Sequence, residues 1–134
     1  MKITQALLDS LTAQAQASPR RRMNLDLRNS PSDGSQRMLN ALEPETVLPI
    51  HRHRKSSETV VCLRGRLREI FYSDAGEVTE VIDLAPGSGC VAVNIPIGQW
   101  LRKGVLERKL LVDSCETTRN PGNKARNQCQ NSIK

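Results

Sequence analysis

Hydrophobic positions divide the chain into a helical beginning and a longer region of short strands. Four aliphatic residues near the start recur at helical spacing with polar residues between them: Ile3, Leu7, Leu8 and Leu11. Ser18-Pro19 follows as a stop signal, so the pattern predicts an amphipathic helix over residues 3–17. Residues 23–27 then alternate between apolar and polar side chains, which predicts a short strand.

From residue 36 onward the chain consists of short apolar runs separated by turn residues, which is typical of β-structure. The expected strands are 36–42, 46–53, 58–64, 66–72, 77–84 and 90–95. Several strands at such short spacing favour an antiparallel sandwich or barrel, so the predicted fold class is all-β with an N-terminal helix. Beyond Trp100 the pattern weakens, and residues 105–112 are expected to supply one more strand.

The length of 134 residues fits a single domain, because domains typically contain about 100–150 residues. We expect a helix-and-strand extension over 1–35, a barrel over 36–115 and a disordered basic tail over 116–134. The tail holds one strong hydrophobe, Ile133, and a segment of this kind cannot offset the entropy lost on ordering it.

The composition also bears on the compartment. No apolar run approaches the roughly 20 residues of a membrane-spanning helix, and no signal-peptide pattern opens the chain. The four cysteines show no metal-finger spacing, and Cys62 and Cys90 lie inside apolar runs, where a reduced thiol behaves as a small hydrophobe. We therefore expect a cytoplasmic protein without a membrane partner.

The net charge of +6 belongs mainly to the end of the chain. Residues 1–100 carry 12 basic and 11 acidic side chains, whereas residues 101–134 carry 8 basic and 3 acidic ones. A basic nucleic-acid-binding module is one interpretation of this charge. It is the weaker one, because one Phe, one Tyr and one Trp are too few for a stacking platform and no helix-turn-helix or finger pattern occurs.

The chain contains two histidines, His51 and His53, and their spacing points to a metal. On a strand, residues two apart project from the same face about 6–7 Å apart, so both imidazoles can reach one ion. Glu58 opens the next expected strand, and a hairpin would bring its carboxylate beside the imidazole pair. Two imidazoles and one carboxylate suit Fe, Mn, Ni or Zn. The simpler alternative is a pair of exposed histidines in a basic loop.

The same residues carry a resemblance to a known family. His51-x-His53-x4-Glu58-x6-Gly65 resembles the first cupin motif, and Pro96-x-Gly98 with Trp100 resembles the second. Longer stretches are similar to the WbuC family of cupin-fold metalloproteins, which are encoded in bacterial O-antigen polysaccharide clusters; they are 18–24, 36–44, 63–66 and 95–100.

This resemblance covers about residues 1–100 and implies a small cupin-type β-barrel, or double-stranded β-helix, with a metal at its centre. It implies one divalent transition metal held by His51, His53 and Glu58, and a cytoplasmic role in O-antigen and lipopolysaccharide biosynthesis. A sugar nucleotide or related small metabolite would be the ligand, and a homodimer is a further expectation. No catalytic residue follows from it.

The chain departs from the family pattern at three places. Glu45 stands where the first motif has a glycine, so the segment entering the site is expected to be strained. Leu101 stands where the family has its fourth ligand, a histidine, and from there the chain is basic and unlike the family. We interpret residues 101–134 as a replaced ending, as after a frameshift. The alternatives are a metal site with three protein ligands and a degenerate, non-catalytic cupin.

Overall fold

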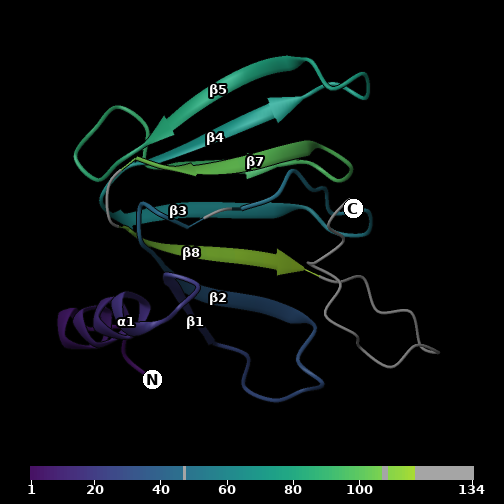
Figure 1. The fold of residues 1–134 in the computed structure, drawn as a ribbon. Helices are drawn as coiled ribbons and strands as arrows, with labels where there is room; N and C mark the ends of the chain where they lie inside the picture. The colour runs from purple at the N-terminus through teal and green to yellow at the C-terminus, as the bar shows by residue number, and fades with distance from the viewer. Residues whose placement is uncertain (47, 107–108, 117–134) are drawn as a thin grey trace.

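The computed structural model describes residues 1–46 and 48–106, and the backbone of 109–116. One helix and two antiparallel β-sheets make up this part of the chain (Figure 1). The helix, α1, spans Gln5–Ala17, and the hydroxyl of Thr4 caps its start by accepting a hydrogen bond from the Leu7 amide at 3.2 Å. The expected disordered tail after residue 116 lies outside the described residues.

The larger sheet has five strands in the order β1-β2-β8-β3-β6, and the smaller has three in the order β5-β4-β7. The strand bounds are β1 Arg22–Asp26, β2 Ser35–Leu42, β3 Glu58–Arg64, β4 Leu67–Tyr72, β5 Val78–Leu84, β6 Ala92–Ile95, β7 Trp100–Val105 and β8 Lys109–Glu116. The predicted fold class, all-β with an N-terminal helix, is therefore confirmed. In the described part of the chain, no helix is long and apolar enough to span a membrane.

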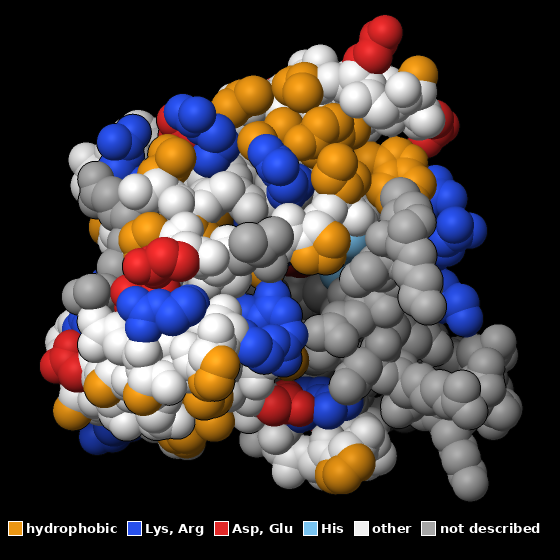
Figure 2. Space-filling model, viewed as in Figure 1, with side chains coloured by type: hydrophobic (Ala, Val, Ile, Leu, Met, Phe, Trp, Pro, Cys, Tyr) orange, Lys and Arg blue, Asp and Glu red, His pale blue; other side chains and the backbone are white. Residues whose placement is uncertain are grey.

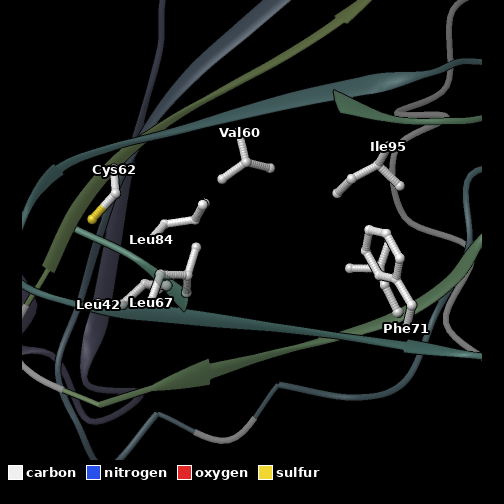
Figure 3. Close-up of a cluster of buried hydrophobic side chains, with 8 residues drawn as sticks. Leu42, Val60, Cys62, Leu67, Phe71, Leu84 and Ile95 are labelled. Atoms are coloured by element: carbon white, nitrogen blue, oxygen red, sulfur yellow. The ribbon is translucent and has the colours of Figure 1, made fainter. Parts of the chain in front are cut away.

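A hydrophobic core fills the space between the sheets. Alternate residues of β3 and β4 point inward, because successive side chains of a strand project from opposite faces. The buried members are Leu42, Val60, Cys62, Leu67, Phe71, Leu84, Ile95 and Leu101 (Figure 3). Glu58, Glu69 and Lys103 lie on the same inward-facing rows as these residues, and their side chains are also buried. The interior of the sandwich is thus apolar along most of its length, with charged groups among the apolar ones.

A second cluster fixes α1 to the other face of the five-stranded sheet. Leu8, Leu11 and Ala15 of the helix pack on Leu39 and Ala41 of β2. The helix lies beside β1 and β2 in Figure 1. The extension therefore has its own apolar contacts, and the division of the chain at residue 35 stays a prediction.

The prediction of a strand over 46–53 is wrong. Among its described residues only His51 makes a β-bridge, and its partner is Leu101 of β7. The segment turns after β2, where Thr46 donates its amide to the carbonyl of Glu43 at 3.0 Å. Glu45 does not take the left-handed conformation that a motif glycine would allow; among described non-glycine residues only Arg21, with φ 55°, does. The expected strain at Glu45 is therefore absent.

The region after residue 100 is more regular than its sequence indicates. It supplies two strands, β7 and β8, where one was expected, and β8 lies between β2 and β3 in the middle of the larger sheet. Its backbone pairs with β2 over eight positions, from Ser35↔Glu116 to Leu42↔Lys109. Whatever the origin of the basic ending, its first part completes the sandwich.

Hydrophobic side chains are exposed on β5, an edge strand of the smaller sheet. Val78 and Val81 are 58% and 51% exposed. Figure 2 shows orange side chains gathered over the β4–β5 part of this face. The homodimer expected from the family resemblance stays a prediction.

Candidate metal centre

His51 is held in place by β7. Its amide donates to the carbonyl of Leu101 at 2.9 Å, and the amide of Leu101 donates back to the carbonyl of His51 at 2.9 Å. Residues directly opposite each other on antiparallel strands project to the same side, so the imidazole shares the inward direction of Leu101. The half-buried His51 therefore faces the interior of the sandwich.

The turn before β7 positions His53. Gly98 has φ +81°, a conformation that side-chain-bearing residues rarely adopt, and its amide donates to the carbonyl of His53 at 2.8 Å. The imidazole of His53 is buried, with only 5% of the residue exposed. The two imidazole rings lie edge to face, with their centroids 5.1 Å apart. In Figure 2 the histidine colour is almost hidden on this face of the molecule.

Glu58 reaches the imidazoles from the opposite sheet. It is the first residue of β3, it lies across from Ile95 of β6, and it is 2% exposed. Its Oε2 lies 2.6 Å from Nε2 of His53. One ligand atom from each of His51, His53 and Glu58 lies within 4.8 Å of the other two. The structure thus brings the three predicted residues together, although the predicted hairpin between them is wrong, because β3 pairs with β6 and β8.

The environment of His51 keeps its imidazole neutral. Burial lowers the pKa of His51; the carbonyl of Pro49 opposes this shift, and the positive charge of Lys103 adds to it. Nδ1 lies 3.1 Å from the Pro49 carbonyl oxygen, which can only accept, so Nδ1 carries the proton of the neutral ring. The lone pair of Nε2 is then available to an ion, as metal-ligating histidines require.

Lys103 is the member of the cluster that sequence analysis missed. Its Nζ lies 2.6 Å from Oε1 of Glu58, and its side chain is 9% exposed. It stands two positions after Leu101 on β7, and that spacing would have placed it on the inward face if a strand had been expected there. The weak pattern after Trp100 hid this signal.

The charges around Glu58 keep its carboxylate ionised. Burial on its own would raise the pKa of Glu58, but the Lys103 ammonium and the His53 ring outweigh it and hold the pKa well below its usual range. An ionised carboxylate and a neutral imidazole are the forms that bind a metal. The donor set and its convergence therefore fit a divalent transition metal, and Lys103 is an additional cation beside it.

Leu101 contributes no donor to this cluster. It is fully buried in the apolar core and lies directly across from His51. A histidine at this position would share the inward face with His51, which agrees with the place where the family resemblance puts its fourth ligand. The apolar side chain leaves the cluster with three residues that could hold a metal ion.

A separate pocket of about 410 Å³ is lined by Ile50, Tyr72, Ser73, Asp74, Gly76 and Trp100. Tyr72 and Trp100 are cross-strand partners, next to the pair Phe71 and Leu101. Because Phe71 and Leu101 point into the core, Tyr72 and Trp100 project away from it. The guanidinium of Arg52 lies 4.3 Å from the centroid of the Trp100 ring. Trp100 therefore lines this pocket, on the face of its sheet opposite to Leu101.

Comparisons with known proteins give a family from the sequence and a fold from solved structures. The sequence profile described as "Domain of unknown function (DUF6016)" matches residues 3–84. No curated protein matches the chain by sequence.

Three solved structures illustrate the likeness. KdgF from Halomonas sp. is 16% identical, with a TM-score of 0.59 over 76% of this chain and 84% of that one. A cupin superfamily protein from Desulfitobacterium hafniense is 14% identical, with a TM-score of 0.57 over 72% of this chain and 78% of that one. YcfD, a ribosomal oxygenase from Escherichia coli in complex with cobalt and succinic acid, is 19% identical, with a TM-score of 0.55 over 64% of this chain and 24% of that one. At these identities the likeness concerns the fold and not the reaction.

Proposed function

The chain belongs to the family described as domain of unknown function DUF6016 and has a cupin fold, and from this premise we propose that it binds one divalent metal ion through His51, His53 and Glu58. One observation carries the proposal. Both histidines of the chain and a buried carboxylate from the opposite sheet bring their ligand atoms within 4.8 Å of one another. An exposed loop of two histidines, the simpler alternative, does not account for the burial of His53 and Glu58.

Two imidazoles and one carboxylate suit Fe, Mn, Ni or Zn. Such an ion, when bound with open positions, supplies Lewis-acid or oxygen-activating chemistry. The residues of the chain prepare the site in advance. Pro49 orients the His51 ring through Nδ1, and the Gly98 turn holds the backbone of His53.

The finer part of the proposal concerns the ligand. We propose a small metabolite of surface-polysaccharide biosynthesis, a sugar nucleotide or a related compound, and this rests on the WbuC resemblance of residues 1–100 alone. The positively charged side chains argue against a nucleic acid as the ligand, because many of them are neutralised within the chain. Several arginines are already paired with acidic side chains of the same chain: Arg21, Arg28, Arg37, Arg64 and Arg68.

A second candidate is a cupin that folds but does not catalyse. Two observations favour it: Leu101 adds no fourth donor, and the ammonium of Lys103 already contacts the carboxylate of Glu58. The two candidates differ in whether a metal is retained and whether any reaction depends on it.

Elemental analysis of the purified protein tests the metal site. We compare the wild type with a His51→Ala/His53→Ala variant and with Glu80→Ala, a matched control that removes an exposed carboxylate of β5. The proposal expects metal in the wild type and in the control, and its loss in the double variant. Equal metal content in all three proteins, or none in any of them after loading with Mn²⁺, Fe²⁺, Ni²⁺ and Zn²⁺ in turn, would overturn it.

A further inference from the structure

The ammonium of Lys103 contacts Glu58, the carboxylate that a metal would need. Its Nζ contacts Oε1 of Glu58 at 2.6 Å, and Nε2 of His53 contacts Oε2 at 2.6 Å. Both oxygens of Glu58 are therefore engaged by groups of the chain. We infer that Lys103 is a built-in cation that competes with the metal for Glu58, so that loading of the site requires the ammonium to yield. This inference rests on the proposed function and adds a regulator to the same site.

The competition follows from charge and burial. Glu58 is 2% exposed and the Lys103 side chain 9%, so water screens the pair little. A divalent ion bound at the same carboxylate would lie close to the ammonium, and like charges repel strongly in a poorly screened interior.

The fold supplies a second carboxylate toward which Lys103 can turn. Glu69 of β4 is the direct cross-strand partner of Lys103, and it is fully buried on the inward face. The Cβ atoms of such partners are about 4.5–5.5 Å apart, within reach of a lysine side chain. An ammonium displaced from Glu58 would therefore stay near a negative charge, which avoids the large penalty of an unpaired buried cation.

An opposite role for Lys103 is conceivable from chemistry alone. A group that hydrogen-bonds a metal-ligating carboxylate often orients it, and its removal then typically weakens metal affinity by roughly 10- to 100-fold. The two roles predict opposite signs for the same substitution. The sign of the change in metal affinity therefore decides between a competitor and a support.

The test is a titration of the full-length protein with Co²⁺ alone, followed by visible ligand-field absorption and by calorimetry. Lys103→Met removes the charge and keeps a slightly shorter unbranched side chain, and Lys103→Gln removes the charge but keeps an N–H donor. Lys103→Arg keeps the charge. Arg102→Gln is the matched control, because Arg102 is exposed on the next position of the same strand.

The inference expects Lys103→Met and Lys103→Gln to bind Co²⁺ roughly 10- to 100-fold more tightly than the wild type, by analogy with the size of effects of groups around metal ligands. Arg102→Gln should bind as the wild type does, and Lys103→Arg, which keeps the charge, should show no gain in affinity. If Lys103→Met does not fold, as judged by circular dichroism, Lys103→Gln decides the question.

The outcomes separate the inference from the proposed function. If the wild type binds Co²⁺ and the two neutral variants bind it equally or more weakly, the inference falls and the metal site stands. If the affinity rises in Lys103→Gln but rises equally in Lys103→Gln/His53→Ala, the gain does not come from this site and the inference is wrong. If no variant binds Co²⁺, both the inference and the proposed function fall.

Discussion

Lys103 of β7 and Glu58 of β3 form an ion pair inside the sandwich, with Nζ 2.6 Å from Oε1, and this pair joins the two sheets. Neither residue is near the other in the chain, and both lie on inward-facing rows of otherwise apolar side chains. A buried pair of this kind adds little net stability, because removing two charges from water is costly.

Breaking this pair by removing one partner should destabilise the metal-free protein. Glu58→Gln removes the negative charge beside the Lys103 ammonium. Because Glu69 remains as a second buried carboxylate, we expect a loss in the free energy of unfolding below the roughly 3–5 kcal/mol of a fully unpaired buried charge. Urea denaturation in the presence of a chelator measures it. The Glu58→Met/Lys103→Met double variant should lose clearly less than the sum of Glu58→Met and Lys103→Met measured singly, and strict additivity would contradict the coupling.

The stability of the metal-free protein should fall in acid more steeply with Glu58 than without it. The pKa of Glu58 is lowered in the folded state, so the unfolded chain takes up the proton first as the pH falls. The contribution of the ion pair is therefore present above the ordinary glutamate pKa of about 4.3 and declines below it. Urea midpoints of the wild type and Glu58→Gln should differ most at neutral pH, and a gap that widens in acid would refute this sign.

Restoring an imidazole at the apolar position of the site should improve metal retention. Leu101→His places a donor across from His51, on the same inward face. We expect a higher metal content after dialysis, accompanied by a loss of about 1–3 kcal/mol in the stability of the metal-free form from burying a polar ring. Leu101→Met is the apolar control. Equal metal retention in the two variants would show that position 101 does not face the ion.

A single methyl group in the turn that holds the backbone of His53 should lower stability and metal binding. Gly98 has φ +81°, and a Cβ there meets nothing within 4 Å, so Gly98→Ala adds backbone strain without a clash. We expect a loss of about 1–2 kcal/mol in the free energy of unfolding, together with weaker metal binding through the displaced His53. Gly89→Ala, at a glycine that also has open space but no left-handed φ, should leave both properties unchanged. A similar loss in both variants would contradict the role of the Gly98 turn.

The local pattern of apolar residues predicts much of the fold. The apolar run within 58–64 predicts a strand whose bounds are those of β3, and the helical spacing near the start predicts α1 to within two residues. Local pattern predicts the strands after Trp100 less well. The reason is that β8 lies between two other strands, and its position depends on partners distant in the chain. Long-range pairing leaves little trace in a window of a few residues.

The sequence by itself determined the chemistry that is available: two histidines two positions apart, a carboxylate five positions later, and a leucine where the related motif has its last ligand. Only the tertiary structure decided how these groups meet. Glu58 arrives from the opposite sheet instead of along a hairpin, and Lys103 turns inward to it. The reason is physical: a charged residue in a basic stretch is expected to face water, and only the pairing of β7 with β4 places Lys103 on the buried face.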